Sequence, residues 1–255
     1  RPQRQIGVEL PKSEVVRHLK RMGHAVSDLG ERLEVLVPAY RNDIMHEVDL
    51  VEDVAISYGY DNIVTNLEVT MTVGSELPAE AWSNNARSVM TGLGFYEVLT
   101  LILSNEDRQF EALGRPRHQN YVKLEHPISL DQTLVRVSLL PGLLDTLSVN
   151  TDQELPQRIF EIGNITVLDS GCETGAREQR NLAAAIIGPK ADYAGIRSVL
   201  DRFLAEFSRP FTLRPSSDPV FIAGRGAEVI DPQGVVLGRL GEIHPQVLEN
   251  FGLSY

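Results

Sequence analysis

The sequence has one cysteine, Cys172, one tryptophan and no long apolar run among its 255 residues. A single cysteine cannot form an internal disulfide, which fits a reducing compartment. No apolar run approaches the roughly 18 residues that a transmembrane helix needs, which excludes such a helix. Arg1 begins no signal-peptide pattern, and we expect the chain to be part of a longer one. We therefore expect a cytoplasmic protein that folds around its own apolar core.

Basic residues are scarce, with 24 Lys and Arg against 35 Asp and Glu, for a formal net charge of -11. Such a surface repels phosphate, which disfavours nucleic acid as a partner of the surface as a whole. The charges are unevenly spread, because residues 1–41 hold eight basic and five acidic residues, whereas residues 42–66 hold six acidic residues and no Lys or Arg. This change of sign marks the first organised part of the chain.

Residues 1–66 have the pattern of a small winged-helix-like domain. Apolar residues at helical or alternating spacing predict a helix, a hairpin and a second helix in this order. These elements are expected at residues 13–22, 24–26, 33–37 and 47–58. Residues 61–77 lack strong periodicity, and we expect a linker between domains there.

Residues 75–255 predict a second domain, in which helices pack on a mostly antiparallel sheet. The expected helices cover residues 78–93, 104–113, 139–149, 192–207 and 244–250. The expected strands cover residues 95–103, 121–124, 158–168, 182–188, 211–213, 227–230 and 235–240. The two domains together place the chain in the α+β class.

Three stretches of the sequence are distinctive when taken together. They are residues 37–63, residues 134–150 followed by RIFEIG at 158–163, and FIAGRGA at 221–227 followed by GRLGEIHP at 238–245. In their order and spacing they resemble the β subunits of phenylalanyl-tRNA synthetases, and the archaeal and eukaryotic form is the nearer. The likeness covers nearly the whole chain, which looks like the C-terminal portion of such a subunit.

The resemblance implies a phenylalanine–tRNA ligase of two α and two β subunits, in which α binds ATP, activates phenylalanine and charges tRNA. It implies that β contributes a winged-helix-like domain and a class II synthetase-like core that has lost catalysis and packs on α. The partners expected from it are the α subunit and, through the complex, tRNA, with no membrane. The alternative is a free-standing interaction protein that binds nucleic acid or a small molecule through a degenerate synthetase-like domain.

Catalytic arginines of the class II kind are not found in the sequence. Such a site needs an aromatic-Arg-x-Glu pattern and an arginine after a Gly-rich run, because the charge of the reacting phosphate must be neutralised. Arg158 and Glu161 have the wrong spacing, and Arg225 and Arg239 lie in short Gly-Arg turns without the Gly-rich run. We assign no catalytic and no cofactor-binding residue, and we expect the chain alone to be inactive.

Four acidic residues form the candidate metal site, namely Asp43, Asp49, Glu52 and Asp53. Helical spacing puts the last three on one side of the second helix, and Asp43 precedes that helix in a loop. Close carboxylates repel one another unless a cation or basic groups compensate, and oxygen ligands suit magnesium or calcium. The alternative is a solvated face that stabilises the helix dipole. In the family that the chain resembles, the matching positions bind a magnesium ion shared with α, so we expect convergent carboxylates and at least one raised pKa.

Two surfaces complete the sequence-based hypotheses. Lys12, Arg17, Lys20 and Arg21 form a basic helix face, which is either a contact for tRNA phosphates or a solvated face. The helices at 78–93 and 139–149 carry more Leu and Val than one sheet face needs, so we expect them to expose an apolar surface toward α. The six histidines lack metal spacing and predict no zinc site.

Overall fold

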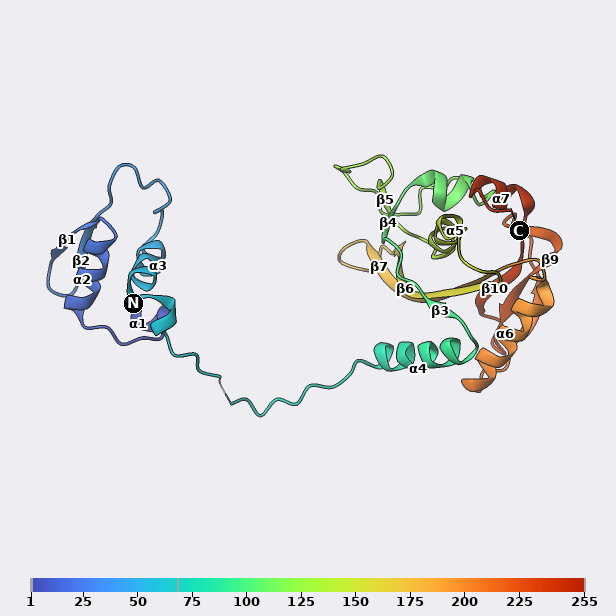
Figure 1. Ribbon diagram of the computed structural model, residues 1–255, viewed down its shortest axis with the longest axis horizontal. Helices are drawn as coiled ribbons and strands as arrows, with labels where there is room; N and C mark the ends of the chain where they lie inside the picture. Colours follow the sequence, from blue (N-terminus) through green and yellow to red (C-terminus); the bar gives the residue numbers. More distant parts are fainter. Residues whose placement is uncertain (1, 68, 255) are drawn as a thin grey trace. The chain divides into compact units, whose positions relative to one another are not determined.

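The computed structural model describes residues 2–67 and 69–254, and it divides into two compact units between Val73 and Gly74. Figure 1 shows the elements of both units along the chain. In the described part of the chain no helix is long and apolar enough to cross a membrane. Helices and short sheets alternate in both units, in agreement with the predicted α+β class.

The first unit is a hairpin with helices packed against it. Its elements are α1 (Pro2–Ile6), α2 (Lys12–Arg21), β1 (Ala25–Asp28), β2 (Leu33–Leu36), α3 (Glu47–Tyr58) and a 3-10 turn (Tyr60–Asn62). β1 and β2 pair antiparallel. Val15 and Leu19 of α2 pack against Val54 of α3 in a small core. The predicted order of helix, hairpin and helix is confirmed, and α1 is an additional element that the sequence pattern does not predict.

The second unit combines four α-helices with short sheets and one turn of π-helix. The helices are α4 (Pro78–Gly92), α5 (Leu140–Val149), α6 (Tyr193–Glu206) and α7 (Pro245–Asn250), and the π-helical turn is Asp107–Glu111. The strands are β3 (Tyr96–Glu97), β4 (Leu103–Ser104), β5 (Leu134–Val135), β6 (Gln157–Leu168), β7 (Ala176–Ile187), β8 (Thr212–Pro215), β9 (Phe221–Ile230) and β10 (Val236–Ile243).

The strands of the second unit form two three-stranded sheets and one small pair. The sheet orders are β3-β6-β7 and β10-β9-β8, and β4 pairs with β5. β3 runs parallel to β6, and the other pairs are antiparallel. One core lies where α5 and α7 meet the sheets, and two others lie beneath α6. The mostly antiparallel arrangement agrees with the sequence prediction.

Two strands of the second unit are much shorter than predicted. The buried strand expected at 95–103 is reduced to β3 and β4 at its ends, because the chain leaves the sheet between them and exposes Leu99. The strand expected at 121–124 is reduced to a single bridge between Lys123 and Leu134. The apolar runs therefore correctly predict that these segments are not helical, but they do not reveal which side chains are buried.

The predicted exposed apolar surface on the helices at 78–93 and 139–149 is also wrong for the second of them. The leucines of that helix are nearly all buried in the chain's own core, at positions 139, 143, 144 and 147. In α4, Met90 is buried and Trp82 is half exposed against Phe207. Exposed apolar side chains gather instead on residues 96–102, where Leu99 is 86% and Leu101 is 72% exposed.

Candidate functional site

The centre of the candidate site is Asp53, which lies on the inner side of α3 and is only 3% exposed. Its Oδ2 lies 2.6 Å from Nε2 of His24, which is equally buried. Its Oδ1 accepts a hydrogen bond of 3.0 Å from Nη2 of Arg41. Both carboxylate oxygens of Asp53 therefore have partners within the chain, as a buried carboxylate requires.

Arg41 joins Asp53 to Asp43 across the loop that leads into α3. Its Nε and Nη2 donate to Oδ1 and Oδ2 of Asp43 at 2.9 and 2.8 Å, in a bidentate pair. The Arg41 guanidinium holds the pKa of the Asp43 carboxyl at about 2, below its ordinary value of 3.8. The same carboxylates raise the pKa of Arg41. The guanidinium is thus the cation that compensates two of the four predicted acids.

Asp49 closes the N-terminus of α3. Its Oδ2 accepts the backbone N–H groups of Met45 and His46 at 2.8 and 2.7 Å, while Nδ1 of His46 accepts the N–H of Val48. This reciprocal arrangement is a capping box. The backbone N–H groups of His46 and Met45 lower the pKa of Asp49. Glu52, one turn further along α3, has an exposed side chain.

The predicted convergence of Asp43, Asp49, Glu52 and Asp53 is therefore wrong for the structure as it stands. Among residues 2–67 and 69–254 no group of three or more His, Cys, Asp or Glu is placed to hold a metal ion. For Asp43 and Asp49 the pKa values are lowered, which is the opposite of the expected rise. The reason is that Arg41 and backbone N–H groups already bind the carboxylate oxygens that the prediction assigned to a metal ion. As the described residues lie, the four carboxylates do not bring three oxygen ligands of this chain to one point.

Part of this network has a signal in the sequence. Arg41 is the last basic residue before the acidic stretch and stands two positions from Asp43, a spacing at which a loop arginine reaches a neighbouring carboxylate. His24 has no such signal, because its contact with Asp53 spans 29 residues and depends on the fold.

A second buried polar network lies in the second unit and joins Arg136, Glu161 and Thr100. Arg136 is 4% and Glu161 is 1% exposed. Nη1 of Arg136 donates to Oε1 of Glu161 at 2.7 Å, and the hydroxyl of Thr100 donates to Oε2 of Glu161 at 2.6 Å. Nε of Arg136 also donates to the carbonyl of Asn164 at 2.9 Å. Both oxygens of Glu161 are thus engaged inside the core.

The Gly-Arg turns also pair with acids of the chain. Arg225 forms a salt bridge with Glu242. Arg239 lies 3.4 Å from Glu228 and 3.6 Å from Asp218. Neither arginine presents an unpaired charge to a phosphate in this structure.

The basic face of α2 is largely tied to the chain itself. Lys12 contacts the carboxylate of Asp28 and the carbonyl of Gly30. Arg17 pairs with Glu14 on the same helix, and Arg21 donates to the carbonyl of Ser57 at 3.4 Å. These contacts favour a structural face over a phosphate-binding one.

His244 also has a structural place. Its Nδ1 accepts the backbone N–H of Gln246 at 3.1 Å, so His244 caps the start of α7.

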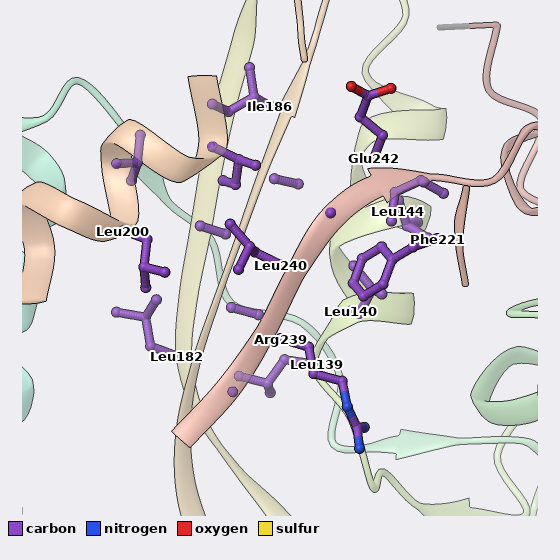
Figure 2. Close-up of a pocket in the computed structure, with 18 of the residues that line it drawn as sticks. Leu139, Leu140, Leu144, Leu182, Ile186, Leu200, Phe221, Arg239, Leu240 and Glu242 are labelled. Atoms are coloured by element: carbon purple, nitrogen blue, oxygen red, sulfur yellow. The ribbon is translucent and has the colours of Figure 1, made fainter. Parts of the chain in front are cut away.

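A cavity of about 1180 Å³ lies in the second unit. It is lined mainly by apolar side chains of α5, β7, α6 and β10. Figure 2 shows Leu182, Ile186, Leu200 and Leu240 on one side of it and Leu140 on the other. Its charged lining residues are Arg115, Arg180, Asp192, Arg239 and Glu242.

Comparison with known proteins covers both units. A model of the tRNA synthetase B5 domain matches residues 1–60, and a model of the phenylalanyl tRNA synthetase beta chain CLM domain matches residues 63–255. The phenylalanine–tRNA ligase beta subunit of Methanosarcina acetivorans is 41% identical over 251 residues, which are 98% of this chain and 45% of that protein. The beta subunits of Archaeoglobus fulgidus and Methanocaldococcus jannaschii are 39% and 35% identical over the same share of this chain, which is 44% and 45% of their length. The chain thus spans about half the length of the curated relatives it matches, and it belongs to the phenylalanyl-tRNA synthetase β-chain family.

Proposed function

We propose that this chain works as part of the β subunit of a phenylalanine–tRNA ligase and supports the attachment of phenylalanine to tRNA by an α subunit. The observation that carries the proposal is 41% identity to a phenylalanine–tRNA ligase beta subunit across 98% of the chain. The complex is an α2β2 tetramer in which α binds ATP and tRNA is held by the assembly. Its place of action is the cytoplasm. The free-standing alternative is not favoured, because both units match modules of the same subunit.

The chain itself contributes no catalytic group to this reaction. Glu161, the acid nearest to the class II pattern, is buried and bound by Arg136 and Thr100. Arg225 and Arg239 face carboxylates, so their charge is already compensated. The unit after Val73 is accordingly a class II synthetase-like core without an ATP site, and the unit before it is a winged-helix-like domain.

The surface that meets α includes the exposed apolar residues of the segment at 96–102. Tyr96, Leu99 and Leu101 are each more than 70% exposed, although this segment lies between β3 and β4 of a folded core. Neighbouring exposed apolar side chains of this size are typical of a protein interface.

A magnesium ion shared with α at Asp43, Asp49, Glu52 and Asp53 stays a prediction. For it to bind, Asp43 would exchange Arg41 for the ion, while Asp49 already caps α3 and Asp53 is buried. Glu52→Gln is the cleanest probe of the ion, because Glu52 is exposed and its replacement leaves the capping box intact. If magnesium joins the subunits, this change weakens assembly of the complex in magnesium but has no effect in EDTA.

Co-expression with a phenylalanyl-tRNA synthetase α subunit tests the proposed function. We expect the two polypeptides to co-purify and to charge tRNA with phenylalanine, whereas this chain alone gives no phenylalanine-dependent pyrophosphate exchange. Exchange by the purified chain, or failure of the full-length subunit to associate with α, would contradict the proposal.

A further inference from the structure

The segment at 96–102 leads from β3 toward β4 and exposes one row of its side chains. Leu99 is 86% and Leu101 is 72% exposed. Val98 and Thr100, which alternate with these leucines, are partly buried. Such alternation is typical of an extended segment with one face toward a core. The two leucines therefore lie on the outer face of the segment, and Thr100 lies on its inner face.

Main-chain hydrogen bonds hold the two ends of this segment but not its middle. The N–H of Val98 donates to the carbonyl of Phe160 at 2.8 Å, and the carbonyl of Ile102 accepts the N–H of Arg136 at 2.9 Å. Within the described part of the chain, no backbone–backbone hydrogen bond involves residues 99–101. A stretch without such bonds opens easily, so its conformation depends on side-chain contacts.

The side chain of Thr100 provides these contacts. Its hydroxyl donates to Oε2 of Glu161 at 2.6 Å and accepts a hydrogen bond of 2.9 Å from Nη1 of Arg136. The same Nη1 donates to Oε1 of Glu161 at 2.7 Å, which closes a ring of three side chains. Arg136 is 4% and Glu161 is 1% exposed. One hydroxyl thus connects the middle of the segment to a buried ion pair.

The main chain around the ion pair fixes its position on the sheet. Nε of Arg136 donates to the carbonyl of Asn164 at 2.9 Å, and the carbonyl of Arg136 accepts the N–H of Thr166 at 3.0 Å. Glu161 belongs to β6, which pairs with β7 along its whole length. The ion pair is therefore a fixed point to which the hydroxyl of Thr100 is bound.

Two glycines leave the space that this ring of side chains occupies. A Cβ at Gly142 of α5 would lie 2.5 Å from Oγ1 of Thr100, and a Cβ at Gly163 of β6 would lie 2.3 Å from Nη2 of Arg136. Both distances are shorter than contacts that a real Cβ makes, so glycine is what allows these side chains to approach. Packing this close leaves Thr100 little freedom to take another position.

Stability alone does not account for a buried ion pair at this place. Moving two charges out of water costs about as much as their attraction returns, and well-packed apolar residues of similar volume are often at least as stable. In some proteins such pairs select one conformation. Here the third member of the ring is Thr100, which stands where the segment has no main-chain hydrogen bonds. The conformation that the pair selects is therefore that of the segment.

We propose that Arg136 and Glu161 are positioning residues for the surface that binds α. Through Thr100 they hold the segment at 96–102 in the conformation that presents its two outer leucines to α. This inference rests on the proposed function, in which the segment meets α. Side chains that are fixed before association lose less conformational entropy when a partner covers them, which increases affinity. The ring of three side chains therefore acts on the affinity for α.

Thr100→Val in the full-length subunit tests the proposal, because it replaces only a hydroxyl with a methyl group. We expect the Kd for α to rise about tenfold, and the NMR order parameters of residues 99–101 in the free subunit to fall from about 0.85 to below about 0.6. Thr100→Ser keeps the hydroxyl and should retain the wild-type Kd. Thr146→Val is the matched control, since its hydroxyl donates to the carbonyl of Gly142 in the same helix at 2.7 Å, and it should change neither quantity.

A double-mutant cycle separates positioning from a general effect on the fold. If Thr100 acts through the leucines, Thr100→Val should not raise Kd further in a subunit that already carries Leu99→Ser and Leu101→Ser. Additive effects on Kd would overturn the proposal. Unchanged order parameters in Thr100→Val, or a wild-type Kd in a variant whose segment has become mobile, would overturn it as well.

Failure of the wild-type subunit to bind α is a different result. It would contradict the proposed function, and with it the link between the segment and α. The order parameters of Thr100→Val would still show whether the buried ion pair holds the segment in place.

Discussion

Nε2 of His24 lies 2.6 Å from Oδ2 of Asp53, and both side chains are nearly inaccessible to solvent. This contact places the most buried of the four predicted metal ligands inside the core of the first unit. Arg41 engages its second oxygen at 3.0 Å. Asp53 consequently joins the residue before β1, the loop before α3 and α3 itself, which is a structural task that does not depend on a metal ion.

Asp53→Ala should destabilise the first unit by about 3–5 kcal/mol, because it leaves buried His24 without its carboxylate and removes one of the two carboxylates that pair with Arg41. Glu52→Ala, one position away on the exposed face of α3, should change stability by less than about 0.5 kcal/mol. Hydrogen exchange of the α2 and α3 amides in the whole chain, measured in EDTA, gives both values. Equal effects of the two substitutions would show that the buried network contributes nothing of its own.

The stability of the first unit should fall as the pH drops from about 4 toward 2. Arg41 keeps the pKa of Asp43 at about 2 in the folded chain, below the ordinary value of 3.8. An acid with a lowered pKa stabilises the fold above its ordinary value, and this contribution is lost as the pH falls through the folded value. In Arg41→Gln the pKa of Asp43 should return toward 3.8. Carboxyl carbon shifts of Asp43 measured by NMR against pH in EDTA follow both proteins, and identical titration curves would exclude Arg41 as the cause.

The sequence predicts the elements of the first unit well, because they depend on local patterns. Val15 and Leu19 stand at helical spacing on α2, and Val54 is buried on α3. The predicted hairpin forms between β1 and β2. Local patterns are not sufficient to predict the surroundings of the acidic residues. Spacing places Asp49 and Asp53 on one helix, but it does not reveal that one caps the helix and the other turns inward to His24.

The second unit shows where periodicity alone is insufficient. The sequence pattern predicts that Leu143 and Leu144 belong to an exposed apolar surface. In the structure, side chains of β7 and α7, which lie far from them in the sequence, cover both leucines. The sequence pattern predicts that Leu99 and Leu101 lie in a buried strand. In the structure both are exposed, because no segment of the described chain covers them. Contacts between residues far apart in the sequence determine whether these leucines are buried. Such contacts cannot be inferred from the periodicity of a single sequence.

Gly163→Ala should destabilise the second unit by about 1–3 kcal/mol, because the added methyl group would crowd the buried Arg136–Glu161 pair. An ideal Cβ at Gly163 would lie 2.3 Å from Nη2 of Arg136 and 2.9 Å from Oε1 of Glu161. Gly238→Ala in β10 is the matched control, because its Cβ meets no atom within 4 Å and its effect should be neutral or slightly stabilising. Urea unfolding of the whole chain by circular dichroism measures the difference. A Gly163→Ala variant as stable as its control would mean that the buried pair shifts at little cost.

The double substitution Leu99→Ser and Leu101→Ser should weaken association with an α subunit without weakening the fold of this chain. Both side chains are more than 70% exposed, so their loss removes little burial within the chain itself. If the segment at 96–102 meets α, however, their removal from an interface core should raise Kd about tenfold or more. Val235→Ser and Val236→Ser together are the control, since these exposed valines lie in the turn and strand at the start of β10. Pull-down and calorimetry of the full-length subunit with α separate the two pairs, while Tm reports on the fold. Unchanged affinity of the leucine variant for α would show that the interface lies elsewhere, because an apolar surface that α covers cannot become polar without loss of affinity.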